Sequence, residues 1–220
     1  MEQQAKTVYV DGLLIRNTLD LDFNIVHINS SEIGYFSPKF YIPRGEVWLD
    51  YHHKNEQDFL IKVVDFEETR DLTLNQSYEK VRKLMKETLC LTGPIPELKL
   101  RSEKAGENTI IYVDGSLVRK YLDPEFVMGG HNLVYDYVPV DEIWIDTMED
   151  SVDQKYTLLH EETELALMKT GKSYDISHEY AIVTEKEARR KNGLGHYPGD
   201  NDYPWRGQSN EKIITKYHVN

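Results

Sequence analysis

Hydrophobic side chains recur at close to the helical period through the stretch 156–180, YTLLHEETELALMKTGKSYDISHEY. The first half of this stretch therefore predicts an amphipathic helix. Gly171 and Ser173 come next and are typical of a helix C-terminus and of the N-cap of a new helix. We expect two helices joined by a tight turn. The apolar stripe of the first helix consists of Leu158, Leu159, Leu165, Leu167 and Met168.

The chain contains much of its pattern twice. Residues 8–23, VYVDGLLIRNTLDLDF, match residues 111–126, IYVDGSLVRKYLDPEF, and YIPRGEVWLD at 41–50 matches YVPVDEIWID at 137–146. Internal matches of this length indicate two copies of one structural unit. Each copy predicts a strand, an Asp-Gly turn, a short helix, an irregular stretch, a tryptophan-bearing strand and the helix pair.

These patterns predict an α+β fold: two tandem copies of a small strand and helix unit, each ending in a helix pair, followed by an irregular C-terminal tail. The expected boundaries are 1–100 for the first copy, 101–108 for a polar linker, 109–193 for the second copy and 194–220 for the tail. The tail is rich in Gly, Pro and Asp, which disfavours regular structure. Its aromatic residues indicate that it packs against the second copy or a partner chain.

Two residue types recur in both copies for structural reasons. Gly12 and Gly115 tolerate the positive φ that a tight turn often requires, so we expect no chemical role for them. Trp48 and Trp144 lie among alternating apolar residues, so we expect them to anchor the cores.

Composition excludes several functional classes. The 220 residues carry a net charge of −12, from 38 acidic and 26 basic side chains, whereas nucleic-acid binding depends on clustered Lys and Arg. Cys90 is the only cysteine, which excludes an internal disulfide and a cysteine-based metal site. No apolar run approaches the roughly 20 residues that span a bilayer, and the N-terminus lacks a signal-peptide pattern. We therefore expect a cytoplasmic protein that binds neither nucleic acid nor membrane.

Candidate metal ligands lie on the predicted helix pair. His160 and Glu164 are four residues apart and project from one helix face, while His178 lies on the second helix and could fold back against that face. Two imidazoles and one carboxylate suit zinc and leave a fourth position for water. Glu161, next to a ligand but aimed elsewhere, could take a proton from that water.

Other interpretations of the helix pair stay open. A solvated acidic helix face with two incidental histidines would produce the same five-residue pattern by chance. Glu179 could replace or supplement Glu164 as the carboxylate ligand. Asp175, three residues before His178, could orient its imidazole.

The first copy lacks the three proposed ligands. Phe66, Arg70 and Arg82 occupy the positions that correspond to His160, Glu164 and His178. A phenyl ring cannot coordinate a metal, and two guanidinium groups supply positive charge where a dication would sit. The first copy therefore has either a degenerate site or ordinary sequence drift on an exposed face.

His131 is a further candidate, because Gly129 and Gly130 precede it. A loop histidine beside a flexible glycine pair could reach a cleft and contact a substrate or an oxyanion. A solvated loop histidine is the simpler alternative.

The motif of His160, Glu161 and Glu164 resembles the active-site helix of zincin-type metallopeptidases, whose usual signature is H-E-x-x-H with a third ligand downstream. More loosely, residues 112–190 are similar to uncharacterised phage and bacterial proteins that carry H-E-x-x-E and a later His. The resemblance implies that His160 is a ligand and Glu161 the general base, and that strand 142–146, EIWID, aligns a peptide substrate. A phage-encoded chain would act in the host cytoplasm. Glu164 departs from the signature by occupying the position of the second histidine.

The sequence therefore predicts a zinc-dependent, peptidase-like hydrolase with its site in the second copy and a peptide or protein as substrate. One alternative is a non-catalytic interaction protein that uses an acidic surface, with or without a structural metal. Another is a carboxylate-bridged di-iron site, suggested by Asp175-x-x-His178, which needs two more ligand-bearing helices.

Overall fold

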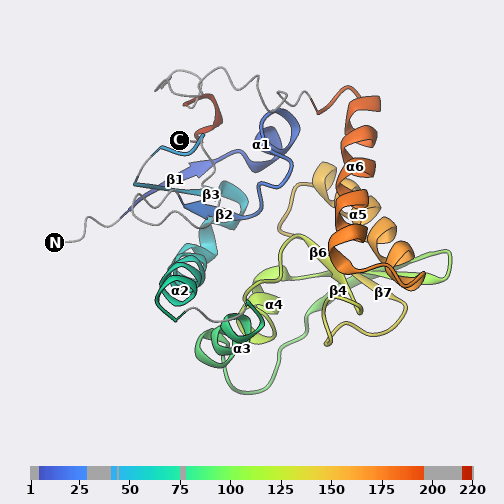
Figure 1. The fold of residues 1–220 in the computed structure, drawn as a ribbon, viewed down its shortest axis with the longest axis horizontal. Helices are drawn as coiled ribbons and strands as arrows, with labels where there is room; N and C mark the ends of the chain where they lie inside the picture. Colours follow the sequence, from blue (N-terminus) through green and yellow to red (C-terminus); the bar gives the residue numbers. More distant parts are fainter. Residues whose placement is uncertain (1–4, 29–40, 44, 75–77, 196–214, 220) are drawn as a thin grey trace. The chain divides into compact units, whose positions relative to one another are not determined.

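The computed structural model describes most of the chain (Figure 1). The described backbone comprises residues 5–28, 41–43, 45–74, 78–195 and 215–219, and the side chains of 67–78 are not described. The chain divides into two compact units. One consists of Met1–Leu89 with His196–Asn220, and the other consists of Cys90–Gly195.

The first unit alternates short strands and helices and ends in two longer helices. Its elements are β1 Lys6–Val10, α1 Gly12–Thr18, β2 Val26–Ile28, β3 Glu46–Asp50, the 3-10 helix η1 Tyr51–Glu56, α2 Gln57–Leu74, α3 Tyr78–Leu89 and the 3-10 helix η2 Thr215–Tyr217.

The second unit begins with an additional strand and then follows a similar order. Its elements are β4 Lys99–Ala105, β5 Asn108–Val113, α4 Gly115–Tyr121, β6 Gly129–His131, β7 Glu142–Asp146, α5 Ser151–Lys169 and α6 Tyr174–Lys191.

The first sheet has the same topology as three of the four strands of the second. Their strand orders are β1-β3-β2 and β4-β5-β7-β6. In each, the strand before the short helix pairs in parallel with the tryptophan-bearing strand, with Val8 opposite Trp48 and Ile111 opposite Trp144. A short strand pairs antiparallel on the other side. Mixed sheets with helices confirm the predicted α+β class, while two tandem copies of one unit stay a prediction.

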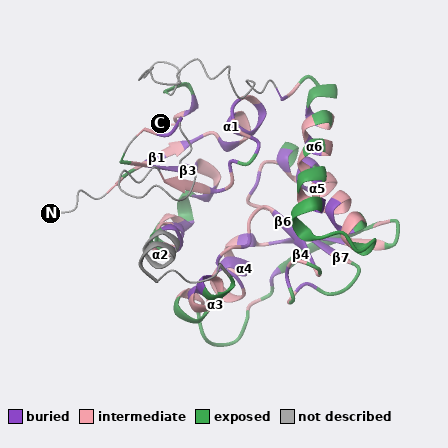
Figure 2. Cartoon of the chain, viewed as in Figure 1, coloured by how far each residue is buried: buried purple, intermediate pink, exposed green. Residues whose placement is uncertain are grey.

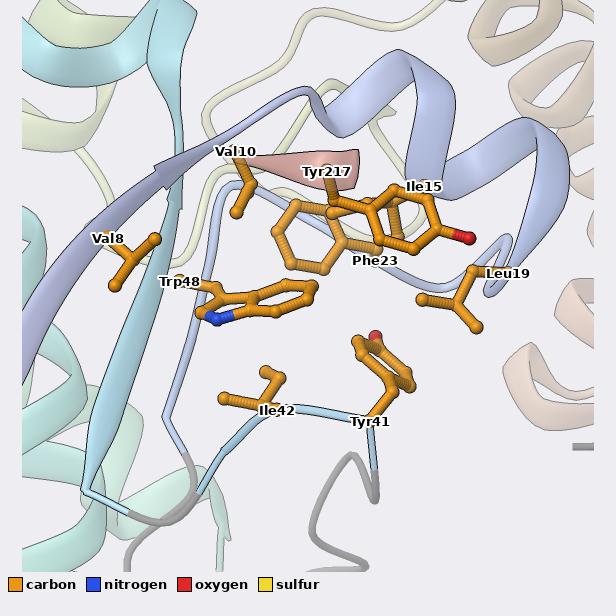
Figure 3. Packing of buried hydrophobic residues seen from close by; sticks show 9 residues of the cluster. All are labelled: Val8, Val10, Ile15, Leu19, Phe23, Tyr41, Ile42, Trp48 and Tyr217. Atoms are coloured by element: carbon orange, nitrogen blue, oxygen red, sulfur yellow. The ribbon is translucent and has the colours of Figure 1, made fainter. Parts of the chain in front are cut away.

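The core of the first unit includes Tyr217 from the C-terminal tail. The rings of Trp48 and Tyr217 lie 6.2 Å apart between centroids, and both side chains are fully buried. Figure 3 shows them packed among apolar side chains from β1, α1 and the following loops. The described part of the tail therefore packs against the first unit, so the expectation that it packs against the second copy is wrong for this part, and packing against a partner chain stays a prediction. Residues 196–214 of the tail lie outside the described residues.

The sheet of the second unit is apolar on both faces, because alternate strand residues point to opposite sides. On one side Ile111, Val113 and Trp144 pack with side chains of α4 and the following loops. On the other, Ile110 and its neighbours Tyr112, Ile143 and Ile145 pack against Leu165 of α5. Helix α5 is thus held firmly on one face of the sheet.

Residues 101–108, expected to be a linker, instead form most of β4 and its hairpin turn. β4 pairs antiparallel with β5, with Ser102 opposite Ile111. The linker prediction is wrong because the side chains of this edge strand are mostly exposed, so its sequence lacks apolar alternation.

The Asp-Gly turns are helix N-termini. Asp114 caps α4 by accepting a hydrogen bond from the backbone N–H of Leu117 at 3.1 Å. Gly115 does not have a positive φ. A Cβ at Gly115 would lie 1.9 Å from Asp146 Oδ2, so the position requires glycine for space. Asp146 in turn accepts a hydrogen bond from buried Arg119 at 2.8 Å, and Gly12, Asp50 and Arg16 repeat this arrangement in the first unit.

Within the described part of the chain, no helix combines the length and apolar character needed to cross a membrane.

Candidate metal centre

Helices α5 and α6 form the predicted pair. α5 ends with Thr170 as C-cap and Gly171 at φ +89°, and α6 begins after Ser173 as N-cap. Glycine suits this position because it tolerates a positive φ. Figure 2 shows buried and exposed positions interleaved along α6. Its buried positions recur every four residues: Ser177, Ala181, Glu185 and Arg189.

The three predicted ligands converge on one point. His160 Nε2 lies 3.1 Å from His178 Nδ1 and 3.7 Å from Glu164 Oε2, and His178 Nδ1 lies 2.8 Å from the same oxygen. Ligand atoms about 2.0–2.1 Å from one ion at tetrahedral angles are separated by about 3.3 Å. The three observed distances, 2.8, 3.1 and 3.7 Å, lie on both sides of this value, so these residues could hold a metal ion.

Glu164 is the centre of the cluster and is 3 % exposed. Burial alone would raise the pKa of its carboxyl, but interactions with His131, His160 and His178 outweigh burial and hold the pKa well below its usual range. The carboxylate is therefore charged at neutral pH, as a metal ligand must be.

His160 lies between two carboxylates. Its Nδ1 is 3.1 Å from Glu185 Oε2, while its Nε2 faces Glu164 and His178. Burial alone would lower the pKa of His160, but the interactions with Glu164 and Glu185 raise it to about 10. A proton must therefore leave Nε2 before this nitrogen can bind a metal.

Glu161, the predicted base, lies beside the ligand set. One oxygen of its carboxylate is within 4.8 Å of the facing atoms of Glu164 and His131. Burial raises the pKa of Glu161 to about 7, against the lowering effect of His160 and together with the charge of Glu164. A carboxylate with a pKa near neutrality suits a general base at pH 7.

His131 lies underneath the ligand carboxylate. It ends strand β6 and has no exposed surface, so the expected loop placement is wrong. Its Nδ1 accepts a hydrogen bond from the Leu133 N–H at 3.3 Å, which leaves the proton of the neutral ring on Nε2. Nε2 lies 3.1 Å from Glu164 Oε1 but is not aligned with it as a hydrogen bond. Its burial beside the Glu164 carboxylate favours support of that carboxylate over an oxyanion role.

The glycine pair before His131 allows close packing. A Cβ at Gly129 would lie 2.8 Å from Thr157 Cγ2 of α5, and one at Gly130 would lie 2.3 Å from the Tyr135 ring. The glycines therefore let β6 pass between α5 and Tyr135, where the sequence suggested a flexible loop.

Three site residues were missed by sequence reasoning: Asp153, Glu185 and Arg189. Arg189 joins the other two, and Glu185 contacts His160. The available signal was the helical spacing of Glu185 and Arg189, which lie seven and eleven residues after His178 and so share its side of α6.

The two other acidic candidates on α6 lie outside the cluster. Asp175 and Glu179 are exposed, and in the described chain neither bonds to His178 or joins a ligand group with it. In the first unit, Phe66 is half-buried and carries no ligand atom, while the side chain of Arg70 is outside the described residues. The degenerate site in the first copy stays a prediction.

Strand β7 is not open for substrate alignment. It pairs in parallel with β5 on one side and antiparallel with β6 on the other. The implied role of EIWID as a substrate-aligning strand is therefore wrong, because its backbone is paired on both sides.

Comparisons with protein-family models, with curated proteins and with solved structures gave no match to this chain. The resemblance to zincin-type metallopeptidases stays a prediction.

Proposed function

We propose that the protein is a zinc-dependent hydrolase of peptide bonds with its site in the second unit. The observation that carries this proposal is the convergence of His160, Glu164 and His178 within 4.8 Å, beside one further carboxylate, which lies within 4.8 Å of Glu164 and His131. That carboxylate, Glu161, has the raised pKa that suits a base.

The donor set favours zinc. Two imidazoles and one carboxylate are the ligands of many catalytic zinc sites, whereas calcium and magnesium take oxygen ligands. Iron(II) also binds to two histidines and a carboxylate, so metal analysis has to separate these two ions.

Zinc, when bound, polarises the scissile carbonyl and lowers the pKa of water. The residues of this chain perform the remaining steps. His160, Glu164 and His178 hold the ion. Glu161 accepts the proton of the attacking water and passes it to the leaving amine. His131 supports Glu164 from the buried side.

Exposure of the ligands indicates where substrate approaches. The side chain of His178 is 38 % exposed, against 12 % for His160 and 4 % for Glu164. The centre therefore faces solvent on the His178 side. The Tyr174 ring stacks on His178 there, at 5.2 Å between centroids.

A second candidate function is a metal-stapled interaction module without catalysis. The observation that favours it is a set of exposed apolar side chains on α6, Ile176, Tyr180 and Val183, which are 49 %, 55 % and 52 % exposed and follow a helical spacing. Exposed apolar stripes often mark surfaces that bind other proteins.

Two successive experiments test the proposal: the first measures metal content and the second measures hydrolysis. The full chain, purified without chelator or affinity tag, should contain about one equivalent of zinc by elemental analysis. Less than about a tenth of an equivalent of any transition metal would remove the metal centre altogether. A protease and hydrolase panel should then detect activity that chelation abolishes. Metal without hydrolysis on the panel would favour the interaction module.

A further inference from the structure

We propose that Asp153, Arg189 and Glu185 form a positioning unit for the metal ligand His160, an inference that rests on the proposed metal site. We call these three residues the charge triad. The triad keeps a proton on His160 Nδ1, so that Nε2 is the nitrogen presented to the metal.

The three residues of the charge triad and His160 form a continuous series of contacts between α5 and α6. Arg189 Nη2 donates to Asp153 Oδ1 at 2.8 Å, and Arg189 Nε donates to Glu185 Oε1 at 2.9 Å. The other Glu185 oxygen, Oε2, faces His160 Nδ1 at 3.1 Å. Each oxygen of Glu185 therefore has its own partner, and the orientation of the carboxylate is fixed.

The charge triad is shielded from water. Asp153 and Arg189 have no exposed surface, and Glu185 is 7 % exposed. The Arg189 guanidinium also lies over the Tyr156 ring, 4.4 Å from its centroid. A buried guanidinium held by two carboxylates and a ring has little freedom to move, which suits a group that must hold another side chain in place.

The charge balance also points towards a cation. One guanidinium and two carboxylates leave the triad with a net charge of −1. The Glu164 carboxylate adds a second negative charge to the buried cluster. Glu161, when ionised, adds a third, so a bound dication would offset two of the three negative charges, and buried clusters require such compensation.

The contacts of His160 determine which of its ring nitrogens faces the metal site. A ring nitrogen that donates its N–H to a carboxylate leaves the lone pair of the other nitrogen free for a metal. In His160 the nitrogen facing Glu185 is Nδ1, and Nε2 faces the ligand oxygen of Glu164 and the ring of His178. Glu185 is thus a positioning residue that acts through His160.

A purely structural role is the competing explanation, and the same unit offers a matched control. Arg119 in the last turn of α4 and Asp146 at the end of β7 form another fully buried ion pair at 2.8 Å, and neither is one of the proposed ligands. Loss of either buried pair should lower the melting temperature. Only loss of Glu185 should weaken metal binding.

The experiment measures zinc affinity of the full chain by chelator competition, and thermal melting of the same proteins without zinc. Glu185→Gln keeps the shape but removes the charge, and its zinc Kd should rise about 10–100-fold. Glu185→Asp keeps the charge and should lie between this variant and the unchanged chain. Arg119→Met should melt at a lower temperature while its Kd stays within about twofold. The cobalt(II) absorption spectrum should change only in the Glu185 variants.

Two results would overturn the positioning role. One is a Glu185→Gln protein whose Kd stays within twofold of the unchanged chain. The other is an equal loss of affinity in Arg119→Met. If Glu185→Gln does not fold, the Glu185→Asp protein decides by the same criteria. Absence of zinc binding in the unchanged chain is a different result, because it removes the proposed function itself.

Discussion

His160 Nε2 lies 3.1 Å from His178 Nδ1, although the two residues are 18 positions apart and belong to different helices. Two imidazole nitrogens at this distance repel each other when both rings are charged. They are compatible when the rings share a proton or a cation. This pair therefore links the folding of the α5–α6 hairpin to what the site binds.

The first prediction concerns His178. His178→Ala should weaken zinc binding by more than about 100-fold, which exceeds the roughly 10–100-fold effect of losing a supporting hydrogen bond. Glu179→Ala is the matched control, because Glu179 is the adjacent residue and is exposed. Chelator competition at fixed pH measures both. Equal affinity of the two variants would show that His178 is not a ligand.

The second prediction concerns pH. The pKa of His160 is raised to about 10 without metal, and its Nε2 must lose a proton before it binds zinc. Zinc affinity should therefore rise with pH, by about tenfold per unit between pH 6 and 8 for one proton released. Isothermal titration calorimetry in buffers of different ionisation enthalpy counts the released protons. Affinity that does not change over this range would contradict a protonated His160.

The same pKa has a consequence for stability without metal. The folded-state pKa of about 10 lies above the unfolded value of about 6.5, so the contribution of His160 is fully present below about pH 6.5 and is lost as the pH rises towards 10. Urea unfolding should therefore give a free energy of unfolding that falls across this window in the unchanged chain. His160→Gln should flatten that part of the curve.

The fourth prediction separates binding from catalysis. Glu161→Gln should retain zinc but lower the rate of hydrolysis by about 10²–10⁴-fold, the usual contribution of a general base. In the unchanged chain the rate should fall in acid, as Glu161, with a pKa of about 7 before the metal binds, becomes protonated. A bound cation moves this fall to lower pH. Undiminished hydrolysis by Glu161→Gln would assign the base to another residue.

The fifth prediction tests the glycine at the start of α4. Gly115→Ala should lower the free energy of unfolding by about 2–4 kcal/mol, because the added Cβ would lie 1.9 Å from the buried Asp146 carboxylate. Ser116→Ala, one residue later, should change stability by less than about 1 kcal/mol. Chemical denaturation compares the two. A stable Gly115→Ala protein would mean that Asp146 can move aside.

The sequence predicted the parts of the site that depend on local spacing. The helix pair follows from apolar periodicity and from Gly171 and Ser173, and the turn brings His160 and His178 together. Glu185 was missed because a single carboxylate on a helix does not reveal which side chain from another helix will face it. That contact is set by the packing of α6 on α5.

Long-range contacts explain the other errors. The need for glycine at position 115 comes from Asp146, which is 31 residues away in sequence. The burial of His131 depends on α5 covering β6. In the sequence alone, the two glycines before it are equally typical of a flexible loop. The sequence predicts a linker at 101–108 because the exposed edge strand β4 carries no apolar pattern.

Tyr217 has a consequence for the order in which the chain can fold during translation. Its ring completes the core of the first unit, yet it follows the whole second unit in the sequence. All residues of the second unit, Cys90–Gly195, emerge before it. We therefore expect Cys90–Gly195 to complete its fold first on the ribosome, while the first unit can complete its core only after Tyr217 has been synthesised.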